Sequence, residues 1–217
     1  MAEDPIIARL KALDVCAVSD ALDRLGRPPA VTGLGPQTVR GRICGRAATV
    51  KFAAGAKTAA RHACTAAVEA AGPGGIVVVE QRTGVDAAGW GGILSRAART
   101  EGLSGAVVDG PARDIDEALE VGFPVFARGC TARTARGRIH EADTACPVQI
   151  GETTVEPGDY VVADSSGVAF IPAAAVEEVL AAAEALAARE AAMTREVEAG
   201  TPVSRVMGAG YEHMLER

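Results

Sequence analysis

Apolar residues recur along the first quarter of this chain with helical spacing. They repeat every three or four positions over residues 5–25, which predicts an N-terminal helix that ends at Gly26. Residues 39–52 then alternate loosely around two glycines, a pattern typical of a bent, barrel-like sheet. An alanine-rich stretch predicts a second helix over residues 58–71.

The middle of the chain alternates short apolar runs with amphipathic stretches. The predicted elements are strand 76–79, helix 91–101, strand 105–109, helix 113–121 and strand 124–127. Regular alternation of this kind indicates a parallel sheet whose strands are joined by right-handed helical crossovers.

The last third changes character, because glycine, proline and serine separate short apolar runs. These runs favour hairpins or a meander of strands at 148–150, 153–155, 160–163 and 168–171. Pro172 then begins a long helix that Gly200 ends, and residues 173–217 are expected to be a mainly helical segment. No repeat or linker divides the chain, so we expect residues 1–217 to form one α/β domain.

Charge and cysteine content narrow the possible partners. A net charge of −6 and a pI near 5.2 argue against direct nucleic-acid binding, which relies on clustered lysine and arginine. Five widely spaced cysteines without a CxxC pair indicate reduced thiols in a cytoplasmic protein. No run approaches the roughly 20 apolar residues of a membrane-spanning helix, and the N-terminus does not have the pattern of a signal peptide. One basic cluster is interpreted first as a solvated loop or subunit contact: Arg128, Arg133, Arg136 and Arg138.

The strongest candidate chemistry lies between Gly89 and Asp114. Gly91 and Gly92 open one predicted helix, and the pair Arg113-Asp114 opens the next helix after a buried strand. Two helix N-termini at the carboxyl end of one strand would direct free N–H groups toward one pocket and favour an anion there.

Each of these residues also has a purely structural interpretation. Arg113 offers a planar fork of donors for a carboxylate or ketone oxygen, and Asp114 offers a hard oxygen ligand for Mg²⁺ or Mn²⁺. However, Asp114 with Glu117 resembles a capping box, and for an isolated pair that capping role is the more common one. The two glycines likewise fit a tight loop before a helix.

Two nearby polar groups have interpretations of their own. Asp109 ends a predicted strand, where it would either orient Arg113 or cap the following turn. The run His140-Glu141-Ala142-Asp143 is interpreted as a solvated polar loop rather than a metal site.

Four segments, in this order and spacing, resemble the RraA-like family over nearly the whole chain. They are VSDALDRLG (18–26), GLSGAVVDGPARDIDE (102–117), FPVFARG (123–129) and PGDYVVADSSGVAFIP (157–172). The family includes the ribonuclease E regulator and class II pyruvate aldolases that act on 4-hydroxy-4-methyl-2-oxoglutarate and 4-carboxy-4-hydroxy-2-oxoadipate. The resemblance implies an α/β sandwich with a barrel-like mixed sheet, of the swivelling-domain type. It also implies homotrimers or homohexamers with active sites between subunits.

The resemblance also implies roles for individual residues. Asp114 would ligate the divalent ion, Mg²⁺ or Mn²⁺, and Arg113 would bind the carbonyl or enolate of a 2-oxo acid substrate. Glu190, from a neighbouring subunit, would approach the metal-bound waters. The pyruvate carboxylate would be held by the segment Gly91, Gly92, Ile93 and Leu94.

One departure from the family pattern concerns the catalytic base. The aldolases carry an acid that twenty residues separate from the Arg-Asp pair, in a D-x20-R-D pattern, whereas this chain has Gly92 there. Loss of a general base typically costs about 10²–10⁴ in rate. Asp86 or an acid of a neighbouring subunit is a possible substitute.

The sequence therefore predicts a metal-dependent lyase that cleaves a 4-hydroxy-2-oxo dicarboxylic acid to pyruvate, decarboxylates oxaloacetate, or does both. Decarboxylation is expected to survive the change at Gly92 better, because it needs enolate stabilisation without a base for a hydroxyl group. The alternative is a non-enzymatic protein-binding regulator of the ribonuclease E inhibitor type, since an acidic surface suits a basic partner. A different small-molecule reaction in a relaxed version of the pocket is a third hypothesis.

Overall fold

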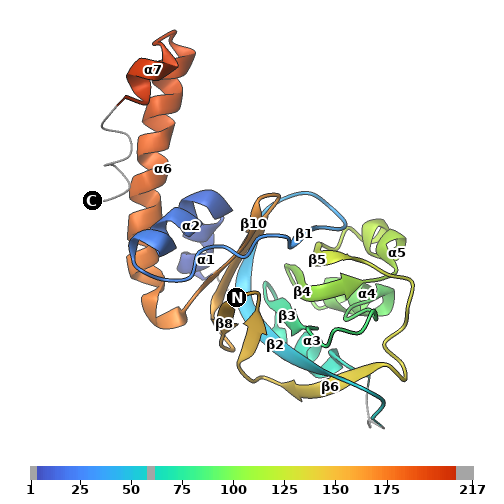
Figure 1. Ribbon diagram of the computed structural model, residues 1–217. Helices are drawn as coiled ribbons and strands as arrows, with labels where there is room; N and C mark the ends of the chain where they lie inside the picture. Colours follow the sequence, from blue (N-terminus) through green and yellow to red (C-terminus); the bar gives the residue numbers. More distant parts are fainter. Residues whose placement is uncertain (1–3, 58–61, 209–217) are drawn as a thin grey trace.

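The computed structural model describes residues 4–57 and 62–208, which form a mixed α/β fold (Figure 1). The helices are α1 (Pro5–Leu10), α2 (Val15–Arg24), α3 (Thr65–Ala71), α4 (Gly92–Thr100), α5 (Ile115–Glu120), the short 3-10 helix η1 (Ala173–Ala175), α6 (Val176–Glu198) and α7 (Val203–Val206). The strands are β1 (Gly35–Pro36), β2 (Ile43–Ala54), β3 (Ile76–Glu80), β4 (Gly105–Ala112), β5 (Val125–Cys130), β6 (Ile139–Thr144), β7 (Val148–Ile150), β8 (Thr153–Val155), β9 (Tyr160–Asp164) and β10 (Gly167–Ile171).

The main sheet is mixed and almost closes on itself. Its order is β1-β5-β4-β3-β2-β9-β10, with β6 added to β2, and the run from β2 to β5 is parallel. At the two ends, β1 pairs with β5, while Val31, just before β1, exchanges two backbone hydrogen bonds with Val168 of β10. The predicted barrel-like mixed sheet is therefore confirmed.

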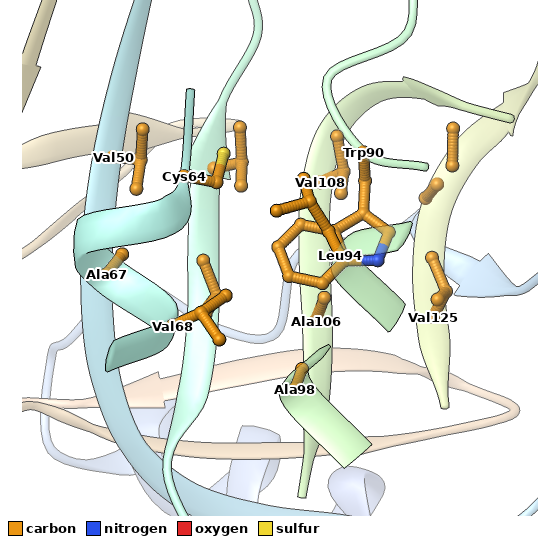
Figure 2. Close-up of a cluster of buried hydrophobic side chains, with 14 of the residues drawn as sticks. Val50, Cys64, Ala67, Val68, Trp90, Leu94, Ala98, Ala106, Val108 and Val125 are labelled. Atoms are coloured by element: carbon orange, nitrogen blue, oxygen red, sulfur yellow. The ribbon is translucent and has the colours of Figure 1, made fainter. Parts of the chain in front are cut away.

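Alternation along the central strands divides the interior into two cores. Val77 and Val79 of β3 join the cluster beneath α3, α4 and α5, whereas Ile76 and Val78 point into the barrel. Figure 2 shows the helical side, where Trp90 lies beside side chains of α4 and β4. Successive residues of a strand point to opposite faces of the sheet. An apolar run such as 76–79 therefore needs apolar side chains packed against both faces.

A third core joins the terminal helices to the antiparallel side of the sheet. Apolar residues of α1, α2 and the first half of α6 pack on β9 and β10. The single helix predicted over residues 5–25 is wrong, because the chain forms α1 and α2 with a break between them. Asp14 ends that break: its side chain accepts the backbone N–H of Ala17 and caps α2.

Other boundaries differ for local reasons. The polar loop expected at His140–Asp143 is wrong, since these residues lie in β6, which pairs with β2 across an irregularity between Lys51 and Phe52. Of the helix predicted at 58–71, the described part begins at Thr65, and residues 58–61 lie outside the described residues. The predicted helix 113–121 begins only at Ile115.

The long C-terminal helix is confirmed, but only its first half is packed. Its buried residues end at Leu186, and the rest of α6 projects from the sheet with α7 at its far end (Figure 1). Residues 209–217 of the predicted helical segment lie outside the described residues. In the described part of the chain, no helix is long and apolar enough to cross a membrane.

Candidate active site

The segment before α4 runs beside the end of β4 and brings two distant sequence motifs together. The N–H of Gly89 donates to the carbonyl of Pro111 (2.9 Å), and the N–H of Arg113 donates to the carbonyl of Trp90 (3.0 Å). Trp90 anchors the segment, because its indole stacks on Phe123 and donates to the hydroxyl of Ser95 (2.9 Å). The backbone therefore places the Gly91 end of one motif against the Arg113 end of the other.

The first turn of α4 provides a short row of backbone donors. Gly91 is the N-cap residue without a side chain, and the N–H of Gly92 donates to Oδ2 of Asp114 (3.1 Å). The next two N–H groups, of Ile93 and Leu94, belong to the first helical turn and so have no carbonyl partner within the helix. The predicted meeting of two helix starts at the end of β4 is present, with Asp114 already bound to one of the amides.

Asp114 does not act as the predicted capping residue. Its backbone lies in the left-handed region (φ 55°, ψ 44°), and its side chain accepts no hydrogen bond from the first turn of α5. Both carboxylate oxygens instead lie 3.1 Å from Nε of Arg113. The capping-box interpretation is therefore wrong. A left-handed conformation in a residue other than glycine is a strained state that tends to persist at functional sites.

Gly92 leaves room that the side chain of Glu117 occupies. A Cβ atom on Gly92 would lie 2.3 Å from Oε2 of Glu117 and 3.0 Å from its Cβ. Gly92 is the position at which the family's aldolases carry an acid. The carboxylate of Glu117, which comes from the first turn of α5, thus stands next to the backbone where that acid would begin.

One hollow collects the residues predicted to bind substrate. It has a volume of about 260 Å³. Its lining includes the predicted residues Gly91, Gly92, Ile93, Leu94, Arg113 and Asp114. A second hollow meets it at Arg113 and Asp114 and is lined in part by Glu117 and Cys130.

Two candidate acids are not brought into this site. Asp109, predicted to orient Arg113 or cap a turn, instead accepts hydrogen bonds from Nε of Arg128 and the N–H of Gly151, both at 2.7 Å. Both interpretations of Asp109 are therefore wrong. Asp86, considered as a substitute base, forms an ion pair with Arg133 (3.2 Å) and does not line the hollow.

Glu190 lies elsewhere in the same chain. It lines a groove between α6 and α7. Burial, together with the negative charges of Asp14 and Asp20, raises the pKa of Glu190 above its ordinary value. A contribution of this residue to the site would have to come from another subunit, as the resemblance implies.

The hollow also contains residues that sequence reasoning missed. His62, just before α3, and Arg136, in the turn before β6, line it together with Phe52 of β2. The sequence alone indicates a solvated loop or subunit contact for Arg136 and no role for His62. No motif connects these positions, because only the closure of the sheet brings them near Arg113.

The donor set suits one kind of metal site. Among residues 4–57 and 62–208, no group of three or more His, Cys, Asp and Glu side chains could hold a metal ion. A carboxylate has about four lone-pair directions, so Asp114 keeps acceptor capacity beyond its bonds to Arg113 and Gly92. Mg²⁺ commonly retains several waters and binds through one or two carboxylates plus substrate, which matches Asp114 but not an all-protein cage.

Comparison with known proteins gives a consistent picture. A family model described as RraA-like: Aldolase/RraA matches residues 15–170. A protein of Halalkalibacterium halodurans named "Putative 4-hydroxy-4-methyl-2-oxoglutarate aldolase" is 32% identical over 183 residues, covering 82% of each chain. Protein DlpA of Legionella pneumophila is 29% identical over 164 residues, 75% of this chain but only 27% of DlpA.

Solved structures agree with the fold. An uncharacterized protein from Pseudomonas syringae pv. tomato superimposes with a TM-score of 0.84 at 27% identity, covering 94% of this chain and 97% of that one. The RNA-processing inhibitor RraA from Thermus thermophilis gives a TM-score of 0.58 at 25% identity, covering 71% and 92%. Because the RraA structure covers only 71% of this chain, part of this chain lies outside the fold that the two proteins share.

Proposed function

The chain belongs to the RraA-like family, and we propose that it is a divalent-metal-dependent lyase of the class II pyruvate aldolase type. Its substrate would be a 4-hydroxy-2-oxo dicarboxylic acid that is cleaved to pyruvate and a second oxo acid, with decarboxylation of oxaloacetate as a related reaction. The observation that carries the proposal is the hollow in which the first turn of α4 meets Arg113 and Asp114.

The α4 amides and Arg113 would bind the pyruvyl end of the substrate. The N–H groups of Ile93 and Leu94, at the positive end of the helix dipole, suit the carboxylate. Arg113 uses Nε to hold Asp114, so its terminal guanidinium nitrogens remain as donors to the oxygen on which enolate charge develops. Preorganised donors of this kind stabilise charge that appears only in the transition state.

Asp114 would hold the divalent ion, Mg²⁺ or Mn²⁺. When bound there, such an ion acts as a Lewis acid that polarises the substrate carbonyl. The hydrogen bonds from Gly92 and Arg113 fix the carboxylate of Asp114 in position for that role.

Glu117 would be the proton acceptor that replaces the family's missing acid. Its carboxylate takes the proton of the substrate 4-hydroxyl, the C3–C4 bond breaks, and its electron pair passes into the pyruvate enolate. Protonation at C3 then completes pyruvate, while the former C4 becomes the carbonyl of the second product. The position of Glu117 against Gly92 supports this role. Decarboxylation of oxaloacetate has no such hydroxyl proton and therefore does not need Glu117.

Two substitutions test this scheme. Asp114→Asn should abolish both aldol cleavage and oxaloacetate decarboxylation with Mg²⁺ or Mn²⁺, whereas Glu117→Gln should lower only aldol cleavage, by about 10²–10⁴. The measurement is the rate of pyruvate release from each substrate, compared with the wild-type protein. Efficient aldol cleavage without any oxaloacetate activity, or equal loss of both reactions in Glu117→Gln, would contradict the scheme.

A protein-binding regulator is the second candidate function. Similarity to the RNA-processing inhibitor RraA and the net charge of −6 favour it, because an acidic surface attracts a basic partner. Asp114→Asn separates the two, since it should remove turnover from an enzyme but leave protein binding largely intact.

The proposed assembly is a homotrimer or homohexamer in which sites lie between subunits and Glu190 comes from a neighbour. Two exposed apolar side chains support it: Ile93 at the hollow is 82% exposed, and Val197 on the projecting part of α6 is 44% exposed. Exposed apolar groups that gather on one surface, as Val197 and Met207 do at the α6–α7 groove, are typical of surfaces that another chain covers.

A further inference from the structure

The hollow is lined by an arginine that the proposed pyruvyl contacts leave unused. Its ionisable lining residues are His62, Arg113, Asp114 and Arg136. Asp114 is the one acid among them, and it is bonded to Arg113. The lining therefore retains a second arginine whose charge nothing in the hollow neutralises.

Arg136 stands on a turn whose preceding carbonyl groups are held by hydrogen bonds. The N–H of Ala88 donates to the carbonyl of Arg133 (3.0 Å), and Nη1 of Arg138 donates to the carbonyl of Thr134 (3.3 Å). The following residue of the sheet, Ile139, is buried. The guanidinium of Arg136 thus extends from a turn that hydrogen bonds hold in place, and Arg136 lines the same hollow as the first turn of α4.

Neighbouring arginines are already engaged, and Arg136 is not. Arg133 forms an ion pair with Asp86 (3.2 Å), and Arg96 lies 3.7 Å from Glu117. Across residues 4–57 and 62–208, the Arg136 guanidinium has neither an acidic partner nor a hydrogen bond; its backbone N–H bonds to Thr134. An arginine without a protein partner at a binding hollow is suited to a planar carboxylate, which it can bind with two parallel hydrogen bonds.

Resting on the proposed function, we propose that Arg136 binds the second carboxylate of a dicarboxylic 2-oxo acid and so selects dianionic over monoanionic substrates. The α4 amides and Arg113 take one end of the substrate, and Arg136 takes the other. Arg136 touches substrate away from the bond that breaks, so its role is specificity rather than proton transfer.

The test measures binding rather than turnover. Isothermal titration in the presence of Mg²⁺ would use two probes that have no 4-hydroxyl group, pyruvate as the monoanion and 2-oxoglutarate as the dianion. Arg136→Gln should weaken 2-oxoglutarate binding about tenfold, because one charged hydrogen-bonded contact is lost, and should leave pyruvate binding within about twofold. Arg136→Lys should retain part of the preference, because it keeps the charge without the fork.

Arg99→Gln is the matched control, since it removes an exposed arginine at the far end of α4 and should change neither affinity. Equal weakening of both probes in Arg136→Gln, or no change in either, would overturn the inference. A wild-type protein that binds both probes with this pattern but cleaves no substrate contradicts the proposed lyase activity alone. Wild-type turnover with an unchanged Arg136→Gln preference contradicts the inference alone.

Discussion

Gly92 and Glu117 share one small space between α4 and α5. The absence of a side chain at Gly92 is what allows the Glu117 carboxylate to lie against the start of α4. A glycine here is therefore a steric requirement of the neighbouring acid, in addition to being a helix start. The acid that is absent from one helix has a counterpart on the next, which lies against the backbone of Gly92 and lines the second hollow.

Moving the acid back to α4 tests this relation. Gly92→Asp should lower the free energy of unfolding by about 1–2 kcal/mol, because the new side chain displaces Glu117 and sets two carboxylates together. Adding Glu117→Ala should recover most of that stability and keep aldol cleavage well above that of Glu117→Ala alone. Urea unfolding and pyruvate release measure the two effects.

Gly35→Ala is the control for this experiment, since a Cβ atom there meets nothing within 4 Å. It should change stability by less than about 0.5 kcal/mol. If Gly92→Asp folds as stably as the wild-type protein, the side chain of Glu117 does not constrain position 92.

Local motifs predicted the neighbourhood of the site but not the conformation of its central residue. The sequence Asp114-x-x-Glu117 fits a capping box, and the expected helix started at Arg113. The left-handed backbone of Asp114 instead turns its side chain toward Gly92, twenty-two positions away. This contact depends on the hydrogen bonds that hold the 89–91 segment beside the end of β4. A sequence motif of a few residues cannot predict such a long-range contact.

At the scale of elements, α2 and α6 were predictable because their apolar faces repeat with helical spacing. The strand β6 was not, since it lies at the side of β2 and three of its six residues are charged or histidine. Glu141 of β6 accepts the backbone N–H of buried Cys64, an interaction that pairs residues far apart in the chain. Patterns of apolar residues identify elements that bury one face in the core. Because most residues of β6 are not buried, its sequence has no such pattern.

The contact between α2 and α6 also collects negative charge. Burial, together with the charges of Asp23 and Asp14, raises the pKa of Asp20 above its ordinary value. A carboxyl group whose pKa is higher in the folded state than in the unfolded state destabilises the fold while it is ionised. That cost is present at neutral pH and disappears as the pH falls through the raised pKa and then below the ordinary one.

Asp20→Asn should therefore stabilise the protein at pH 7 and raise its melting temperature, because it removes a carboxylate whose ionised form is disfavoured by burial and by neighbouring negative charges. The gain should shrink toward zero near pH 3, where the wild-type carboxyl group is largely protonated in both the folded and the unfolded state. Thermal melts of both proteins at the two pH values measure this. A gain of equal size at both pH values would show that packing, and not charge, is responsible.

At the scale of the whole molecule, order and spacing of several segments carried more information than any single motif. The resemblance to the RraA-like family is confirmed by the match over residues 15–170, and with it the mixed, barrel-like sheet. The rest of the hollow's lining could not be foreseen, because His62 comes from the loop between β2 and α3 and Arg136 from the loop between β5 and β6. Their approach to Arg113 depends on the closed sheet as a whole.

The projecting part of α6 is the feature that the fold of one chain leaves unexplained. The buried residues of α6 end at Leu186, and beyond it Val197 and Met207 of the α6–α7 groove are 44% and 47% exposed. In the proposed assembly these side chains are covered by another subunit, which also receives Glu190. Burial of such groups between subunits stabilises association by about 25 cal/mol for each Å² of apolar surface.

Val197→Asp should therefore shift the protein from the proposed trimer or hexamer toward the 22.0 kDa single chain, because it places a charge in an apolar interface. Light scattering after size-exclusion chromatography measures the mass, and pyruvate release should fall together with it because the site is completed by a neighbour. Ala70→Asp adds the same charge at an exposed position of α3 and should change neither quantity. A wild-type mass of one chain, or a Val197→Asp variant that stays assembled, would contradict the assembly while leaving the roles of Arg113 and Asp114 to be judged by their own variants.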